Sequence, residues 1–257
     1  MADNTNTSSI ELWQSIQREA QLASGTDPVF GHALAAAILD HSDLGSVVAH
    51  QIGMRLGRSA GERTRFAAVA REAHLAAPTL VDAANGDLRG IAARDPATTA
   101  LLPPLLNYKG YIALQTFRVS HWLWTNERLD LALLLQAESS TSLQVSIHPS
   151  AQIGSSVFLD HATGIVIGAF AAIGDDVTIL QNVTIGRQDA LPGRSPWIGR
   201  GVLLSSGATV LGDVGIGDFA RIGAGAVVTT DVPAGCTAVG APARLTNCPE
   251  KPMPAGA

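Results

Sequence analysis

Apolar side chains follow a helical period in the first part of the chain. Between residues 9 and 140 they recur three or four positions apart, as at Ile10, Trp13 and Ile16. This spacing places them on one face of an α-helix. We therefore expect about eight helices in this region.

Two short motifs predict helix starts. Ser42-Asp43 and Asp95-Pro96 each contain an aspartate. An aspartate side chain can cap the unpaired N–H groups of a first helical turn, and proline is favoured at the first helical position. Helices are therefore predicted to begin beside both motifs.

After residue 145 the apolar period changes to six. A large aliphatic anchor recurs every sixth residue, and a small or β-branched residue follows most anchors by four positions. Neither an alternating strand nor a helix produces this period. The anchors form three runs: Ile147, Ile153 and Leu159; Ile167, Ile173, Ile179 and Ile185; and Ile198, Leu204, Val210, Ile216, Ile222 and Val228.

A period of six is typical of a three-sided solenoid, in which three hexapeptides form one coil and each anchor points inward. The sequence thus predicts an α+β chain. We expect an α-helical domain over residues 1–140 and a left-handed parallel β-helix of hexapeptide repeats over 141–246. A flexible, Pro-rich tail is expected over 247–257.

The repeat is interrupted twice. Ile167 follows Leu159 by eight positions instead of six, and Ile198 follows Ile185 by thirteen. Loops held by a rigid scaffold often carry function, although a surface insertion can also be tolerated without one. Both interpretations stay open for these two segments.

Composition narrows the class of protein. Hydrophobic residues make up 46% and charged residues 15% of the chain, which excludes a disordered protein. The net charge of −5 argues against nucleic-acid binding. So little charge favours an oligomer that covers part of the surface. The polar N-terminal segment and the short apolar runs predict a cytoplasmic protein that does not bind membranes.

Few residues suggest chemistry of their own. Cys236 and Cys248 have neither a metal-binding nor a redox spacing. Only His148 and His161 lie among the repeats, so a three-histidine metal site is not expected. The Asp160-His161 pair lies at the first interruption of the repeat, and histidine is the usual general base near neutral pH. A lone histidine is nevertheless more often structural.

Several longer motifs resemble the serine O-acetyltransferase family of hexapeptide-repeat acyltransferases, over roughly residues 10 to 245. In the repeat region they are Gln-Val-Ser-Ile-His-Pro at 144–149, Leu-Asp-His-Ala-Thr-Gly at 159–164 and Leu-Gln-Asn-Val-Thr-Ile-Gly at 180–186. In the helical region they lie at 40–46, 94–96, 104–106, 109–111, 113–115 and 121–124.

The resemblance implies an assembly, a co-substrate and a set of site residues. Trimers would pair into hexamers, and acetyl-CoA would bind between neighbouring β-helices of a trimer. His161 would be the catalytic base, with Asp95, Asp160 and Arg194 binding the amino-acid acceptor; Arg suits a carboxylate because its fork binds both oxygens. Gly186, Ser206 and Ala224 would lie in the CoA groove.

The chain departs from the family pattern at the acceptor site. Ser146 stands where the family has the aspartate that orients the catalytic histidine, and Ser195 replaces a second histidine of the substrate site. Ala169-Phe170 replaces Glu-Thr, and the acceptor loop is one residue shorter. An orienting aspartate fixes the histidine tautomer and stabilises the imidazolium. These changes indicate a site adapted to another acceptor or weakened.

Three functional hypotheses follow. The leading one is a CoA-dependent O-acyltransferase that transfers acetyl to the hydroxyl of L-serine, as in cysteine biosynthesis. The second is a diverged paralogue with another acceptor or acyl donor, and the third is a catalytically weak binding or regulatory homologue. No tight tail complex with a cysteine synthase is expected, because the final Ala257 offers less apolar surface than the family's isoleucine.

Overall fold

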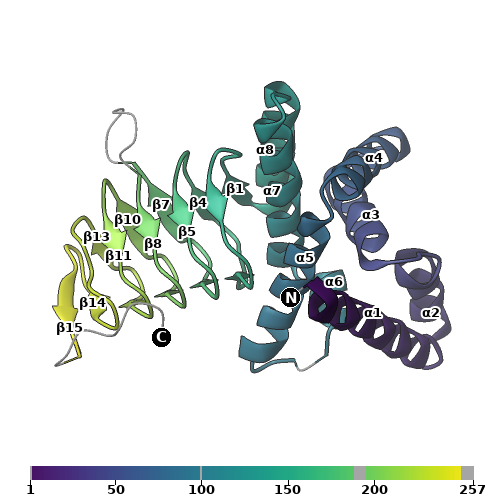
Figure 1. Ribbon diagram of the computed structural model, residues 1–257, viewed down its shortest axis with the longest axis horizontal. Coiled ribbons are helices and arrows are strands. Elements are labelled where there is room, and N and C mark those ends of the chain that lie inside the picture. Colours follow the sequence, from purple (N-terminus) through teal and green to yellow (C-terminus); the bar gives the residue numbers. More distant parts are fainter. Residues whose placement is uncertain (1, 99, 188–194, 250–257) are drawn as a thin grey trace. The chain divides into compact units, whose positions relative to one another are not determined.

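The computed structural model describes residues 2–98, 100–187 and 195–249 (Figure 1). Its chain divides into two compact units, Met1–Val119 and Ser120–Ala257. The division falls within helix α7 (Lys109–Thr125), whereas the first β-strand begins at Val145. The domain boundary at residue 140 therefore remains a prediction from composition.

The first unit is helical, and the expected number of helices is confirmed in the described part of the chain. The helices are α1 (Ala2–Ser24), α2 (Pro28–Leu34), a π-helix (Ala35–Leu39), α3 (Leu44–Leu56), α4 (Ala60–Ala76), α5 (Thr79–Arg94), α6 (Leu102–Asn107), α7 and, in the second unit, α8 (Leu129–Leu143).

One of the two predicted helix starts is confirmed. Asp43 is the N-cap of α3, where its carboxylate accepts a hydrogen bond from the Ser46 amide at 2.8 Å and forms a capping box. The second prediction is wrong: Asp95 follows the C-terminus of α5, and the next helix begins only at Leu102. Asp95 Oδ1 does accept from the Ala97 amide, but it closes a turn instead of a helix.

The core of the helical unit contains one charged pair. Asp87 is fully buried and accepts two hydrogen bonds of 2.9 Å from the Arg118 guanidinium and a third from Gln115 Nε2. Buried charges are tolerated when they are paired and hydrogen-bonded in this way. The pair thus ties α5 to α7 inside this unit.

The second unit is a parallel β-helix with three sheets (Figure 1). Sheet A contains β1 (Val145–Ile147), β4 (Ile165–Ile167), β7 (Thr184–Gly186), β10 (Thr209–Leu211) and β13 (Val227–Val228). Sheet B contains β2 (Gln152–Ile153), β5 (Ala172–Ile173), β8 (Trp197–Ile198) and β11 (Gly215–Ile216). Sheet C contains β3 (Phe158–Leu159), β6 (Thr178–Ile179), β9 (Leu203–Leu204), β12 (Arg221–Ile222), β14 (Thr237–Val239) and β15 (Arg244–Thr246).

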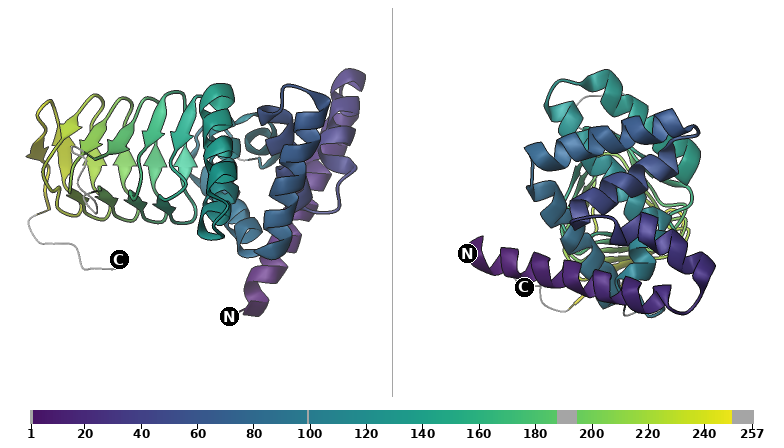
Figure 2. Two further views of the ribbon diagram at one scale, coloured as in Figure 1. Left: turned by 90° about the horizontal axis from the view of Figure 1, so that it is seen from above. Right: turned by 90° about the vertical axis from the view of Figure 1, so that its right-hand side faces the viewer.

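The predicted anchors form the core of this solenoid, whose strands stack coil upon coil in Figure 2. Along sheet A, Ile147, Ile167, Ile185, Val210 and Val228 are all at most 4% exposed. Their strands pair in register, with Ile147 opposite Ile167 and Ile167 opposite Ile185. The predicted left-handed β-helix of hexapeptide repeats is confirmed.

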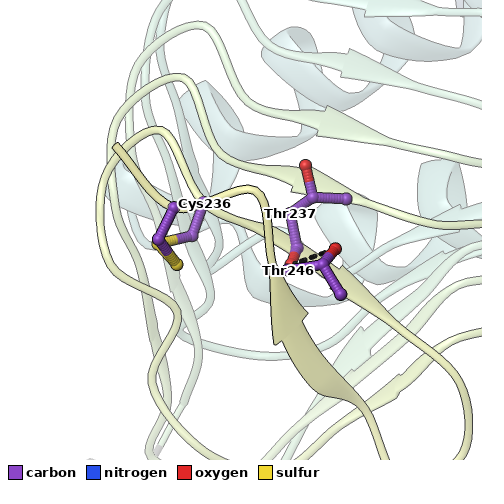
Figure 3. Close-up of a disulfide and its surroundings, with 4 residues drawn as sticks. Cys236, Thr237 and Thr246 are labelled. Carbon is purple, nitrogen blue, oxygen red and sulfur yellow. Dashed lines mark hydrogen bonds between the residues drawn. A yellow bond between two sulfur atoms is a disulfide. The ribbon is translucent and has the colours of Figure 1, made fainter. Parts of the chain in front are cut away.

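A disulfide lies at the C-terminal end of the solenoid (Figure 3). Cys236 and Cys248 are 4.1 Å apart at their Cα atoms and flank the antiparallel hairpin of β14 and β15. The spacing of the two cysteines, which matches neither a metal-binding nor a redox motif, did not indicate this pairing. They lie twelve positions apart in the sequence, and the hairpin brings them together. No described helix is long and apolar enough to cross a membrane.

Candidate active site

The turns of the β-helix align into edges that carry the predicted site residues. We call the turns from sheet C to sheet A the C–A edge, and those from sheet A to sheet B the A–B edge. Asp160, His161, Ser206 and Ala224 lie on the C–A edge, whereas Ser195 lies on the A–B edge and Gly186 ends strand β7 directly before that edge. Ser146 lies on the outer face of sheet A, between the two edges.

His161 projects from the C–A edge into solvent. It follows β3, and its side chain is 73% exposed. Its backbone has a φ of 54°, a left-handed conformation that is uncommon outside glycine. Asp160 Oδ1 lies 3.9 Å from His161 Nε2, so a negative charge is close to the ring. The pair offers a base beside an anion at an accessible position.

Backbone hydrogen bonds stack the C–A edge from coil to coil. Asn182 N donates to Thr163 O at 2.8 Å, and Gly225 N donates to Ser206 O at 2.9 Å. The predicted CoA positions Ser206 and Ala224 are therefore neighbours in successive coils. A Cβ at Gly225 would meet nothing within 4 Å, so the surface beside Ala224 is open.

Gln181 adds an unused acceptor to the same edge. Its Oε1 atom is buried and has no hydrogen-bond partner in the described part of the chain. Gly207 N donates to the Gln181 carbonyl at 2.9 Å, which places Gln181 in the coil before Ser206. A buried acceptor of this kind is satisfied when a ligand or a neighbouring subunit donates a hydrogen bond from an N–H group.

Ser146 is held by a residue of α8. Gln136 Nε2 donates to Ser146 Oγ at 3.2 Å, and nearby Ser139 Oγ donates to the Val145 carbonyl at 3.0 Å. Both bonds join α8 to β1. Among the described residues, Ser146 makes no hydrogen bond to His161. The structure therefore shows no direct support for the His161 ring from Ser146.

The A–B edge brings three of the sequence departures together, namely Ala169, Phe170 and Ser195. Ser195 Oγ donates to the Ala169 carbonyl at 2.9 Å, and the Phe170 amide donates to Ser150 Oγ at 3.2 Å. Phe170 is 55% exposed, with a φ of 62°. An apolar ring thus stands on this edge beside Ser195. Arg194, the predicted carboxylate ligand, lies outside the described residues.

His148 has a structural environment. Its Nδ1 atom accepts from the Ser150 amide at 3.1 Å, and its ring packs edge-on against Trp124 at 5.3 Å. Burial, together with the nearby charge of Arg187, lowers the pKa of His148 below its ordinary value. A neutral, packed ring stabilises the first coil and is poorly placed to act as an exposed base.

Asp95 belongs to the helical unit. Its Oδ1 accepts from the Ala97 amide and its Oδ2 from the Tyr108 hydroxyl, both at 2.8 Å. No cationic side chain of the described residues lies within 4.0 Å of this half-buried carboxylate. Its negative charge is thus oriented by neutral donors and available to a cationic group.

Comparison with known proteins identifies the family. A family model for the N-terminal region of serine acetyltransferases matches residues 12–116. Serine acetyltransferase from Salmonella typhimurium is 41% identical over 244 residues, which is 95% of this chain and 89% of that protein. The chain belongs to the serine acetyltransferase family. The predicted resemblance is confirmed, and the chain is an acyltransferase of this family.

Solved structures of the family share the whole fold. Soybean serine acetyltransferase complexed with serine is 42% identical, with a TM-score of 0.89 over 93% of this chain and 99% of that one. A serine acetyltransferase in complex with CoA is 37% identical, with a TM-score of 0.89 over 93% of this chain and 100% of that one. The similarity covers both units of this family member.

The structure also reveals contacts that the sequence motifs did not indicate. Gln136 and Tyr108 each hold a predicted site residue, and Gln181 carries an unpaired acceptor on the C–A edge. Gln136 is the polar residue that ends the apolar run Leu131–Leu135, which is a signal for a specific contact. In the described residues, no three His, Cys, Asp or Glu side chains form a group that could hold a metal ion.

Proposed function

We propose that the chain transfers the acetyl group of acetyl-CoA to the hydroxyl of L-serine, with His161 as general base. One observation carries this assignment. The exposed His161 stands beside Asp160 on the edge that also presents Ser206 and Ala224 in successive coils, within a member of the serine acetyltransferase family. A base and two residues proposed to bind the donor thus share one edge.

The reaction follows from these positions. His161 removes the proton of the serine hydroxyl as its oxygen attacks the thioester carbonyl. The tetrahedral intermediate collapses by breaking the carbon–sulfur bond, and the imidazolium returns its proton to the CoA thiolate. The products are O-acetylserine and CoA. Holding both substrates on one edge makes the attack effectively unimolecular.

The acceptor is recognised as a zwitterion. Asp95 and Asp160 attract its ammonium group, and Arg194 binds its carboxylate in a bidentate manner. Asp95 suits this role because its oriented charge has no cationic partner among the described residues. Ser146 and Ser195 complete the acceptor site with neutral hydroxyls, and Gly186 contributes to the donor groove.

The division between two edges supports a site shared by two copies of the chain. Residues 164–168 cross sheet A from the C–A edge to the A–B edge, which is about 13 Å at the rise of an extended strand. A single residue spans only about 3.6 Å, so one residue of the chain cannot bridge the distance between the two edges. Ser195 is fixed to Ala169 on the A–B edge, so a neighbour's A–B edge completes the site beside His161. We propose a trimer, paired into a hexamer.

The second candidate function, a changed acceptor or acyl donor, has a specific observation in its favour. Phe170 presents an exposed apolar ring on the A–B edge, next to a Ser195 hydroxyl whose bond to Ala169 is already formed. An acceptor with more apolar surface than serine would bind more tightly through contact with that ring.

The cytoplasmic location expected from the sequence stays a prediction.

Release of free thiol from the acyl donor tests the proposed function. The purified chain is assayed with acetyl-CoA or succinyl-CoA against L-serine, L-threonine and L-homoserine. We expect acetyl-CoA with L-serine to be the fastest pair. His161→Ala should reduce that rate by about 10² to 10⁴, as for loss of a general base. His32→Ala, which removes an exposed histidine of the helical unit, is the matched control.

The other outcomes are equally clear. A different donor–acceptor pair that is faster and still depends on His161 would favour the diverged paralogue. Binding of CoA and serine without thiol release from any pair would favour the catalytically weak homologue. A rate that survives His161→Ala would remove the assigned base.

A further inference from the structure

The carboxylate of Asp95 has an unusual set of partners for a half-buried acidic group. One oxygen accepts from the Ala97 amide and the other from the Tyr108 hydroxyl, each at 2.8 Å. Both donors are neutral. Asp87 in the same unit is different, because it is fully buried and paired with the Arg118 guanidinium. Asp95 is therefore oriented without being neutralised.

Tyr108 is well placed to impose this orientation. It lies between α6 and α7, where its amide donates to the Pro104 carbonyl at 3.2 Å and its carbonyl accepts from the Tyr111 amide at 3.1 Å. Both sides of its backbone are thus anchored to helices. The phenol reaches back thirteen positions along the chain to the segment that follows α5.

We propose that Tyr108 is a positioning residue that holds the Asp95 carboxylate ready for the ammonium group of the acceptor. This inference rests on the proposed function, in which Asp95 binds that ammonium. A carboxylate offers about four lone-pair sites, and the two observed bonds occupy two of them. The remaining sites face no cation among the described residues, so they stay open to the acceptor.

The kind of hydrogen-bond donor that holds Asp95 affects how well the carboxylate can bind the ammonium group. A phenol hydroxyl supports the negative charge by hydrogen bonding but brings no positive charge of its own. An arginine in its place would compete with the ammonium for the same carboxylate. Without the hydroxyl, the carboxylate rotates more freely, since the terminal torsion of aspartate is broad. The acceptor must then order it on binding, which weakens affinity.

A purely structural role would leave a different signature. If the Tyr108 hydroxyl only fixed the turn after α5, its loss would lower the unfolding temperature and affect every kinetic constant through partial unfolding. A positioning role acts on the acceptor alone. It raises KM for L-serine and the dissociation constant of L-serine, and it leaves kcat and KM for acetyl-CoA unchanged.

The chain supplies a matched control, because Tyr108 and Tyr111 are its two tyrosines. The Tyr111 hydroxyl donates to the Ala84 carbonyl at 3.2 Å and is buried in the core of the helical unit. Tyr108→Phe deletes the hydroxyl that bonds to Asp95, and Tyr111→Phe deletes the hydroxyl that bonds to the Ala84 carbonyl. Both are compared with wild type for KM, kcat, L-serine binding by calorimetry, and unfolding temperature.

We expect Tyr108→Phe to raise KM and Kd for L-serine by about tenfold, the effect of roughly 1.4 kcal/mol lost from a hydrogen bond to a charged group. Its kcat and its KM for acetyl-CoA should stay within about twofold of wild type. Tyr111→Phe should lower the unfolding temperature and leave KM for L-serine unchanged. Unaltered serine affinity in Tyr108→Phe, or equal changes in the two variants, would overturn the inference.

Asp95→Asn separates this inference from the assignment beneath it. We expect it to raise KM for L-serine, and we expect Tyr108→Phe to add nothing in the Asp95→Asn background. If Tyr108→Phe acts fully in that background, it does not work through Asp95 and the inference fails. If Asp95→Asn leaves serine affinity unchanged, both roles fail while acyl transfer by His161 stands. Absence of transfer to serine by wild type would instead refute the proposed function.

Discussion

Gln136 Nε2 donates a hydrogen bond to Ser146 Oγ over 3.2 Å. A residue of α8 thus orients the serine that stands in place of the family's orienting aspartate. The amide occupies one lone pair of the hydroxyl and directs the hydroxyl proton elsewhere. Ser146 thus has a fixed orientation and no charge. It cannot stabilise an imidazolium as a carboxylate would.

Restoring that charge should make the base stronger. We predict that Ser146→Asp raises kcat on L-serine about tenfold, the effect of roughly 1.4 kcal/mol of added transition-state stabilisation. The Gln136 amide can donate to the new carboxylate, so the fold should accept the change. Ser146→Asn, which has the same shape without the charge, is the control in the thiol-release assay.

The opposite result would also be informative. If Ser146→Asp lowers the rate on the best acceptor, the serine takes part in a different recognition scheme. The diverged-paralogue hypothesis would then gain at the expense of serine acetylation.

Ser195→His should act on the acceptor instead of the base. The change exchanges the hydroxyl bonded to the Ala169 carbonyl for an imidazole on the A–B edge. We predict a lower KM for L-serine, with a smaller effect on kcat. Ser195→Ala, which removes the same bond and adds no ring, is the control.

Combined with Ser146→Asp, the Ser195→His change should not be additive, because both residues are proposed to face one acceptor. Initial rates of the two single variants and the double variant at varied serine concentration measure the coupling. Strict additivity would show that the two positions serve separate sites.

The fold was predictable because the hexapeptides repeat the same hydrophobic pattern. A large anchor such as Ile167 must point inward, its neighbours must form the turn, and thirteen anchors agree. Exposure of His161 also follows, since an interruption of the repeat falls on a turn. Local sequence signals failed where the same residues suit two structures. Asp95-Pro96 favours both a helix start and a tight turn, and it forms a turn because the next helix, α6, begins further along the chain.

Contacts between non-repeating segments were not predictable in the same way. Tyr108 meets Asp95 and Gln136 meets Ser146 across ten or more positions, and no period relates the members of either pair. The Cys236–Cys248 pairing likewise depends on a hairpin of antiparallel strands that departs from the parallel repeat. Such contacts arise from tertiary packing, which a local pattern does not encode.

Subunit mixing should reveal the shared site. If His161 of one copy works with Arg194 of its neighbour, then His161→Ala and Arg194→Ala chains are each impaired alone. Trimers assembled from a mixture contain some sites with both residues intact, about one quarter of them for random assembly. We predict recovery of about that fraction of wild-type activity after the mixture is unfolded and refolded. Light scattering that finds a fully active monomer would contradict the assembly.

Buried His74 predicts a loss of stability in mild acid. Burial lowers its pKa, whereas the hydrogen bond from its Nδ1 to the Gly45 carbonyl and the charge of Asp43 raise it less. Because the folded pKa lies below the unfolded value of 6.5, the unfolded chain takes up the proton first. The free energy of unfolding should therefore fall as the pH drops below 6.5. His74→Asn, which keeps a donor near the Nδ1 position, should show a shallower dependence in thermal unfolding from pH 8 to 5.

The disulfide should stabilise the C-terminal hairpin. Cys236 and Cys248 close a segment that includes β14 and β15, and all three residues of β15 are exposed, so little apolar burial holds that strand in place. Closing a loop of about 15 residues is worth roughly 3 kcal/mol in the chain-entropy model. A dithiol reductant should therefore lower the unfolding temperature of wild type and speed amide exchange at Thr237–Val239.

Cys248→Ser isolates the effect of the tether, because Cys248 is exposed whereas Cys236 is 2% exposed and part of the core. The variant should match reduced wild type and should not respond to the reductant. The hairpin also contacts a segment near the proposed donor site: Val227 N donates to Gly240 O, and Ala243 N donates to Val227 O, three residues beyond Ala224. We therefore expect KM for acetyl-CoA to rise more than KM for L-serine in the reduced protein. Two titratable thiols in the untreated chain, or an unfolding temperature insensitive to the reductant, would contradict a stabilising disulfide between Cys236 and Cys248.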